Sequence, residues 1–317
     1  MADTEVDPYE IRTTDGWVLP LARGRGSAPG ARPVLLVPGY GMNASIFRYH
    51  ASGPSFFDQL RRAGLDPWSV DLRGASTTRA TRGAREVRLA EQAFIDLPTA
   101  IDQIRSVTGA ANVGAIGCSL GGTLLYGLAG ATERPGIDRI VAMGSPLRWS
   151  RTRLVRAFLA SSPLSCTIPL VGSRRLAAAA LPLAARFASP LLKVYLNPRI
   201  TAIEPTAMLT RTVEDPLRSI NREMARWMST GHLDLDGVSV SRALHRYRGR
   251  LLVVHSRGDG ICDSASALSA LDHVRTPAEV LEVSHPAGEP IGHADLFLCD
   301  AAPERVFAPV ARFLATA

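Results

Sequence analysis

The segment Asn112-Val113-Gly114-Ala115-Ile116-Gly117-Cys118-Ser119-Leu120-Gly121-Gly122 joins a short apolar run to a Gly-x-Ser-x-Gly motif, and an apolar segment then continues to Ala131. The first run predicts a buried strand and the second predicts a helix. A serine at such a tight strand-to-helix turn has a strained backbone, and the residues two before and two after it have little room for a side chain. Gly117 and Gly121 meet this requirement. The motif therefore predicts that Ser119 is a nucleophile.

Cys118 is the alternative nucleophile in the same turn. A motif centred on Cys118 would put Ile116 and Leu120 at the two crowded positions, where their side chains would not fit. The pattern therefore favours Ser119 over Cys118.

Short β-branched apolar runs alternate with longer helical patterns on both sides of this motif, which is typical of a mainly parallel sheet covered by helices. The expected strands cover residues 34–37, 68–71, 112–117, 139–144, 251–255 and 280–283. The expected helices cover residues 54–63, 87–107, 120–131, 265–273 and 303–315. Ahead of them, residues 10–13 and 17–20 flank Asp15-Gly16 and predict an antiparallel hairpin at the edge of the sheet.

Residues 147–247 interrupt the alternation with Ala-, Leu- and Arg-rich helical sequence that is broken by prolines. We expect this segment to form an inserted helical cap, or lid. Residues 1–146 and 248–317 would then form one α/β core.

The order of these elements, together with the Gly-x-Ser-x-Gly turn, resembles the α/β-hydrolase superfamily from Pro33 to Leu314. The resemblance implies the α/β-hydrolase fold and a cap-bearing serine esterase or lipase-like enzyme. Residues 117–124 are also similar to the Gly-x-Cys-x-Gly-Gly-Thr-Leu motif of polyhydroxyalkanoate synthases. Those enzymes use cysteine where this chain has Ser119, and the difference favours ester hydrolysis over polymerisation.

A catalytic serine needs an imidazole to accept its proton and a carboxylate to orient that imidazole. The resemblance implies that these groups follow in the order serine, acid, histidine. Asp259 lies in a turn, after the expected strand 251–255, that resembles the acid loop of the family. His293 lies in a Gly-His loop before the last expected helix. The predicted catalytic triad is therefore Ser119, Asp259 and His293.

Neighbouring residues offer alternatives to this triad. Asp263 could replace Asp259, although its position also suits the cap of a helix that begins near Ser264. His285 could replace His293. Asp295 could hold the His293 loop in place.

The oxyanion of a tetrahedral intermediate needs two hydrogen-bond donors. We expect backbone N–H groups to supply them. One belongs to Leu120, directly after the nucleophile. The other belongs to Tyr40 in the loop Pro38-Gly39-Tyr40-Gly41, where the family often has His-Gly.

The expected cap carries two features that bear on the substrate. Leu154, Val155, Phe158 and Leu159 have near-helical spacing opposite Arg153 and Arg156, which suits either core packing or an acyl-binding or lipid-facing lid. Further on, four residues could line an apolar acyl pocket or form ordinary core, namely Met208, Met224, Trp227 and Met228.

The composition of the 317 residues, 46% hydrophobic and 21% charged, excludes a disordered tail, a disulfide-rich miniprotein and a collagen-like chain. Lys193 is the single lysine, so 36 − 1 = 35 of the basic residues are arginines, and they outnumber the 29 acidic residues. A nucleic-acid or anionic-membrane site would need arginines clustered with aromatic residues on one face, and only Arg148, Arg151, Arg153 and Arg156 come close. We therefore expect a solvated basic surface and no nucleic-acid partner.

The four cysteines have no metal-binding spacing, so we expect reduced thiols, no metal and no cofactor. The acidic start of the chain lacks the pattern of a signal peptide, and the longest apolar stretch, 176–185, is too short to span a bilayer. These features predict a cytoplasmic protein without a transmembrane segment, for which weak contact with a lipid surface is possible.

The leading hypothesis is a serine hydrolase that cleaves small-molecule carboxylic esters with an apolar acyl group. An acyltransferase or a thioesterase could use the same triad, because only the acyl donor or acceptor would differ. The hypothesis from another class is a binding module that has lost catalysis on a hydrolase fold.

Overall fold

The computed structural model describes residues 4–132, 135–187, 192–202 and 211–316. Its main sheet has the strand order β1-β2-β4-β3-β6-β7-β10-β11, with β5 paired to β2. The strands of this sheet are β1 (Val6–Arg12), β2 (Trp17–Gly24), β3 (Arg32–Val37), β4 (Leu65–Val70), β5 (Arg79–Ala80), β6 (Val113–Cys118), β7 (Ile137–Met143), β10 (Arg250–His255) and β11 (Ala278–Glu282). The mostly parallel sheet and the edge hairpin predicted from the sequence are confirmed.

The six neighbouring strands β4, β3, β6, β7, β10 and β11 run parallel to one another. Strand β2 is antiparallel to both of its neighbours, β1 and β4. The central strands are apolar because both faces of the sheet are covered; all six residues of β6 are buried. Val37 of β3 pairs with Gly117 of β6, and Cys118 pairs with Met143 of β7. The ends of three central strands therefore meet beside Ser119.

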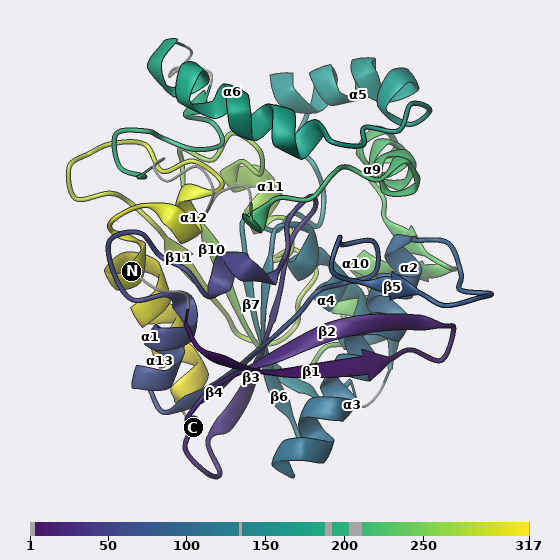
Figure 1. Ribbon diagram of the computed structural model, residues 1–317, viewed down its shortest axis with the longest axis vertical. Coiled ribbons are helices and arrows are strands. Elements are labelled where there is room, and N and C mark those ends of the chain that lie inside the picture. Colours follow the sequence, from purple (N-terminus) through teal and green to yellow (C-terminus); the bar gives the residue numbers. More distant parts are fainter. Residues whose placement is uncertain (1–3, 133–134, 188–191, 203–210, 317) are drawn as a thin grey trace.

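Helices cover the sheet on both faces (Figure 1). The helices of the core are α1 (Phe56–Arg62), α2 (Leu89–Glu91), α3 (Leu97–Thr108), α4 (Leu120–Ala131), α11 (Ser264–Leu268), α12 (Asp295–Leu298) and α13 (Ala308–Ala315), with short helices η1 (Ala44–Phe47), η2 (Gln92–Asp96) and η3 (Pro303–Phe307). One apolar cluster packs α3 and α4 against the sheet, and a second packs α1 and α13 against its other face.

The expected helix over residues 265–273 is shorter in the structure. It begins at Ser264 and ends at Leu268, because the Ser269 hydroxyl binds the Ser266 carbonyl and accepts the Leu147 N–H.

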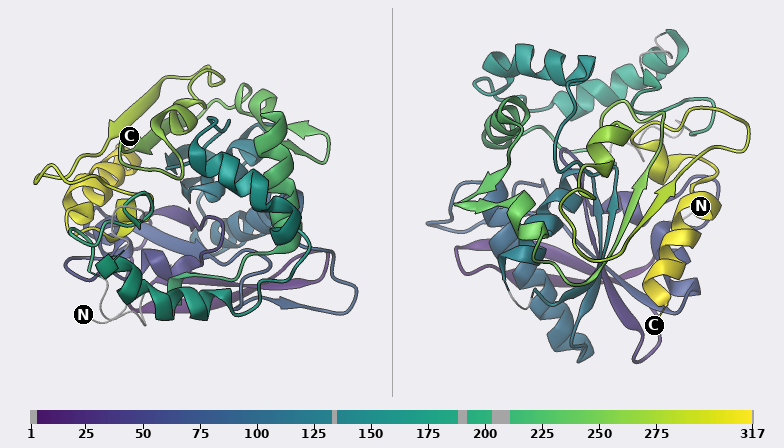
Figure 2. Two further views of the ribbon diagram at one scale, coloured as in Figure 1. Left: turned by 90° about the horizontal axis from the view of Figure 1, so that it is seen from above. Right: turned by 180° about the vertical axis from the view of Figure 1, so that it is seen from behind.

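The segment 147–247 forms α5 (Arg153–Ser165), α6 (Ser173–Phe187), α9 (Arg218–Thr230), the two-stranded β8 (Asp234–Leu235) and β9 (Val238–Ser239), and α10 (Val240–Leu244). Figures 1 and 2 show α5 and α6 outside the rest of the molecule, beyond one end of the sheet. In contrast, α10 packs against α4. The division of the chain at residues 147 and 247 stays a prediction.

The side chains of this segment bear on the two features that the sequence predicted for the cap. Met224 and Trp227 of α9 are buried in the cluster that covers α4, so they are core residues, and Met228 packs against them. Met208 lies outside the described residues. Of the apolar residues expected along α5, Leu154 is exposed and Val155 is buried.

Candidate active site

Ser119 occupies the turn between β6 and α4 with φ 50° and ψ −120°. This backbone conformation is strained for a residue with a side chain, and such strain is concentrated at functional sites. The Ser119 N–H donates to the Met143 carbonyl at 2.8 Å. A Cβ at Gly121 would lie 2.5 Å from the Val37 carbonyl oxygen, and one at Gly117 would lie 2.3 Å from the Gly122 Cα. The two glycines therefore have the close contacts that the motif predicts.

Asp259 and His293 form a buried pair. His293 Nδ1 lies 2.6 Å from Asp259 Oδ2, and Asp259 Oδ1 accepts the N–H groups of Ile261 and Cys262, each at 2.9 Å. In the tautomer with its proton on Nδ1, His293 donates a hydrogen bond to the Asp259 carboxylate, and the lone pair on Nε2 is free. In this state the imidazole can act as a base at Nε2.

Gly144 connects this pair to Ser119. A Cβ at Gly144 would lie 3.0 Å from His293 Cε1 and 3.2 Å from Asp259 Oδ2. Gly144 directly follows Met143, whose carbonyl binds the Ser119 N–H. The three predicted residues thus surround the end of β7, although within the described ranges the Ser119 hydroxyl forms no hydrogen bond to His293.

The alternative residues have other partners. Asp263 is the N-cap of α11 and accepts the Ser266 N–H. His285 binds Asp300 at 2.8 Å. The Cys118 thiol is buried, and burial raises its pKa, so a thiolate is disfavoured there.

The loop that carries His293 is anchored by Asp295. The Asp295 carboxylate accepts the Gly292 N–H at 2.7 Å, the Asn197 N–H at 2.9 Å and the Thr201 hydroxyl at 2.6 Å. The Ala294 N–H also donates to the Tyr195 carbonyl at 2.7 Å. Residues 195–201 therefore fix the position of the loop.

The loop after β3 passes next to the nucleophile. A Cβ at Gly39 would lie 3.0 Å from Ser119 Cβ. Within the part of the chain that the structure describes, the backbone N–H groups of Tyr40 and Leu120 donate to no protein group. Both donors remain available for an oxyanion.

Residues from the predicted cap hold this loop. The Tyr40 hydroxyl donates to Asn221 Oδ1 of α9, and Asn221 Nδ2 donates to the Ser165 carbonyl at the end of α5 at 2.8 Å. The Glu214 carboxylate accepts Asn43 Nδ2 at 2.7 Å and forms an ion pair with Arg174 of α6 at 3.3 Å. Both cap helices are therefore linked to the loop that carries Tyr40.

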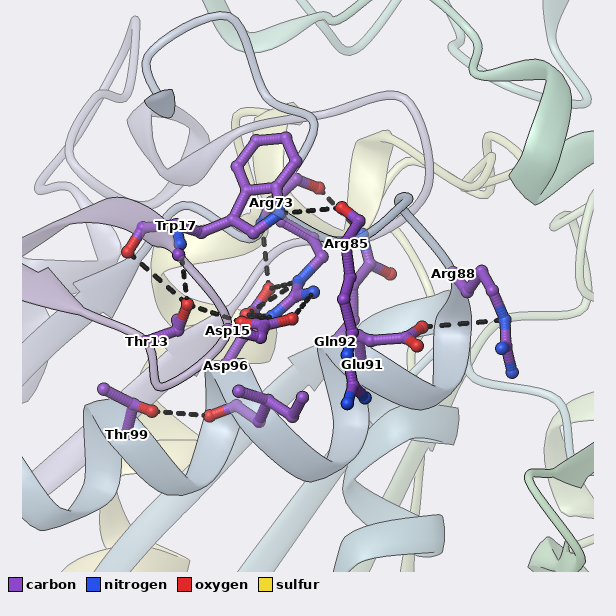
Figure 3. Close-up of polar contacts among 12 residues, drawn as sticks. Thr13, Asp15, Trp17, Arg73, Arg85, Arg88, Glu91, Gln92, Asp96 and Thr99 are labelled. Carbon is purple, nitrogen blue, oxygen red and sulfur yellow. Dashed lines mark hydrogen bonds and ion pairs between the residues drawn. The ribbon is translucent and has the colours of Figure 1, made fainter. Parts of the chain in front are cut away.

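A buried arginine orders the neighbouring loop after β4. Asp15 and Asp96 both face Arg73, at 2.6 and 2.7 Å from its guanidinium nitrogens (Figure 3). Burial raises the pKa of Asp96 to about 6, although Arg73 opposes that shift. Residues 72–75 of this loop line a small cavity of about 50 Å³ beside Tyr40 and Leu120.

A larger apolar cavity of about 270 Å³ lies between α6 and the core. Ala178 and Leu181 of α6 line one side, and Leu196 and Leu298 line another. Val213, on its wall, pairs with Met42, whose sulfur lies 3.5 Å from that of Cys118. The cavity is thus separated from the turn at Ser119 by one or two side chains.

Sequence reasoning did not identify Gly144, Glu214 or Asn221. The sequence predicted Gly144 as the end of the strand 139–144. Because that strand was expected next to the one that carries Ser119, its end could have been predicted to lie at the site. Glu214 lies in the irregular chain before α9 and Asn221 lies in α9, and neither residue belongs to a motif. Among the described residues, no group of three His, Cys, Asp or Glu side chains could hold a metal ion.

The chain matches the model of the Alpha/beta hydrolase family over residues 34–308. It therefore belongs to that family, and the fold class and superfamily predicted from the sequence are confirmed. Within the described residues, no helix is both long and apolar enough to cross a membrane.

Two solved structures show the same fold. An esterase from Exiguobacterium antarcticum is 15% identical, with a TM-score of 0.63 and coverage of 98% of this chain and 100% of that one. A hydrolase from Pseudomonas aeruginosa is 15% identical, with a TM-score of 0.62 and coverage of 98% and 99%.

A curated relative, lipase member N from Homo sapiens, is 30% identical over 155 residues. The alignment covers 44% of this chain and 38% of the lipase. The chain therefore spans well under half of the length of this relative.

Proposed function

We propose that this protein is a serine hydrolase that cleaves carboxylic esters with an apolar acyl group through an acyl-enzyme on Ser119. The observation that carries the proposal is the 2.6 Å contact between His293 Nδ1 and Asp259 Oδ2 beside Gly144, next to the strained turn at Ser119.

In the acylation step, the Ser119 oxygen attacks the ester carbonyl carbon while His293 Nε2 accepts the hydroxyl proton. Asp259 stabilises the imidazolium that forms, because its carboxylate accepts a hydrogen bond from Nδ1–H and is fixed by two backbone N–H groups. The C–O bond to the alcohol then breaks, and the imidazolium protonates the leaving oxygen.

The negative charge that develops on the carbonyl oxygen is stabilised by the Tyr40 and Leu120 N–H groups. These donors are already in position on the loop after β3 and at the start of α4, so little reorganisation is required. In deacylation, His293 removes a proton from water, which attacks the acyl carbon. The ester bond to Ser119 then breaks, the imidazolium returns its proton to the Ser119 oxygen, and the acid is released.

The proposed acyl site is the 270 Å³ cavity under α6. Its lining is mostly aliphatic, which favours an apolar chain over a charged one. In this proposal α5 and α6 form the cap over the site.

The test is hydrolysis of p-nitrophenyl esters of increasing acyl length by the wild type, Ser119→Ala and Cys118→Ala. The Ser119→Ala variant should lose about 10⁵- to 10⁶-fold in kcat. The Cys118→Ala variant should stay within about tenfold of wild type, because Cys118 is buried beside the nucleophile without taking part. Circular dichroism checks that each variant is folded.

Mass spectrometry should also find the acyl group, or a fluorophosphonate label, on Ser119. Wild-type activity in folded Ser119→Ala would overturn the proposal. Turnover of acyl thioesters without turnover of any oxygen ester would replace it with a thioesterase.

A further inference from the structure

The outward surface of α5 and α6 is apolar, although no other segment of the chain that the structure describes covers it. Large hydrophobic side chains are exposed on these helices and on the connection between them, with Val171 87%, Leu176 73% and Phe187 72% exposed. Of the eleven large exposed hydrophobic residues in the described chain, seven lie between residues 154 and 187. We define the outer cap face by six of them: Leu164, Ile168, Val171, Leu176, Leu183 and Phe187.

Helix α6 has apolar side chains on both of its faces. Leu176, Leu183 and Phe187 recur at helical spacing on the exposed side, while Ala178 and Leu181 face the cavity on the other side. The cavity explains the apolar residues on the inner side of α6 but not those on its exposed side. A single layer of helix with an apolar outer stripe indicates that a further apolar phase contacts it.

The charge of the same region has one sign. The sequence contains no Asp or Glu from residue 139 to residue 203, and it has nine arginines and one lysine there. Among the described residues, the Arg153, Arg156, Arg175 and Arg186 side chains of α5 and α6 form no ion pair. The outer cap face is therefore apolar and flanked by cationic groups.

We propose that the outer cap face binds an anionic phospholipid surface. The four arginines would contact lipid phosphates, and the leucine, valine and phenylalanine side chains would enter the boundary with the acyl chains. Figures 1 and 2 show α5 and α6 as the outermost layer at this end of the molecule, so a flat surface can reach both helices.

The charge favours this partner over two others. A second copy of the chain that presented the same face would bring like charges together. A nucleic acid duplex would contact the arginines but would leave the apolar side chains of the face exposed to water. A single strand would stack its bases on aromatic side chains, whereas the six side chains that define the face include one aromatic residue, Phe187.

The test is flotation of the full-length protein with vesicles of phosphatidylcholine alone or of phosphatidylcholine mixed with phosphatidylglycerol. The wild type should bind the mixed vesicles at least about tenfold more tightly, and added salt should weaken the binding. The readout is vesicle binding, so a failure of the proposed ester hydrolysis would not affect it.

Two sets of variants separate the contributions. The triple change Leu176→Ser, Leu183→Ser and Phe187→Ser should reduce binding at least about tenfold. The fourfold change of Arg153, Arg156, Arg175 and Arg186 to glutamine should remove the preference for the anionic lipid.

Matched controls lie elsewhere on the surface. Val107→Ser with Val280→Ser changes exposed apolar residues outside the cap. Arg62, Arg82, Arg305 and Arg312, changed together to glutamine, lower the net charge equally. Both controls should bind as the wild type does.

Three results would overturn the proposal. They are absence of binding to the mixed vesicles, equal loss of binding in the control and cap variants, and concentration-dependent dimerisation through this face in light scattering without lipid.

Discussion

The Tyr40 hydroxyl donates a hydrogen bond to the Asn221 side-chain oxygen across 181 residues of sequence. Tyr40 is on the loop that passes next to Ser119, and its backbone N–H is a proposed oxyanion donor. Asn221 also donates to the Ser165 carbonyl at the end of α5. Burial raises the pKa of Tyr40, so the phenol stays protonated and remains a donor. The Asn221 side chain thus links the end of α5 to the loop that carries the proposed oxyanion donor Tyr40.

We expect Asn221→Ala to lower kcat by about tenfold with a smaller change in KM, because the loss displaces an oxyanion donor while the acyl cavity remains. Tyr40→Phe should have a similar effect, and the double variant should be no worse than either single variant. Steady-state kinetics of the four proteins on one p-nitrophenyl ester gives the double-mutant cycle. Fully additive losses would show that the two residues act independently.

Asp259 and Asp263 form a matched pair for the identity of the acid. Asp259→Asn should lower kcat by about 10³- to 10⁴-fold, since the amide no longer stabilises the imidazolium. Asp263→Asn removes a charge four residues away and should change kcat less than about tenfold. The proposed assignment fails if the larger loss belongs to Asp263→Asn.

Ala178 and Ala179 are adjacent on α6, but only Ala178 faces the cavity. Ala178 lines the apolar cavity and Ala179 is exposed. Ala178→Trp should therefore move the optimum in the ester series to shorter acyl chains, because the indole fills the cavity. Ala179→Trp should retain the wild-type optimum. The same shift in both variants would place the acyl chain elsewhere.

Asp295 gives a pH-dependent contribution to stability. Burial raises its pKa from 3.8 to about 6, against the hydrogen bonds that it accepts from Thr201, Gly292 and Asn197. The folded protein therefore holds this proton between about pH 4 and pH 6, where the unfolded chain has lost it. As the pH rises from about 4 to about 6, the free energy of unfolding should therefore fall by about 1–3 kcal/mol through Asp295. Above about pH 6 the contribution of Asp295 should be constant.

Urea unfolding of the wild type and of Asp295→Asn, measured through this window, isolates that contribution. The slope of unfolding free energy against pH should be less negative, or more positive, in the variant. Parallel curves would show that Asp295 does not carry the proton.

The sequence was most informative where chemistry depends on local spacing. The crowded positions at Gly117 and Gly121, the edge hairpin and the alternation of strands and helices follow from backbone sterics and periodicity, and the structure has all of them. The roles of Ser119, Asp259 and His293 remain predictions, although the structure brings the three residues to the end of one strand.

Contacts that depend on how the cap packs could not be predicted in this way. Asn221 and Glu214 reach the oxyanion loop from helical or loop sequence without a motif, and their partners are more than 170 residues away. Leu154 is exposed and Val155 is buried, and the sequence left open which of these apolar residues of α5 would be covered, since helical spacing alone does not determine that.

Arg73 joins the first hairpin to the rest of the fold, because its side chain is fully buried between Asp15 of the hairpin turn and Asp96 of η2. Truncation of the chain beyond Asp15 would leave the guanidinium one carboxylate short in a water-free site, a loss that typically costs about 3–5 kcal/mol. The loop at residues 72–75, which lines the cavity beside Tyr40, would lose its support. The hairpin thus supports the loop at residues 72–75 beside the proposed active site. Proteolytic cleavage within the hairpin should inactivate the protein, although the cut is remote from Ser119 in the sequence.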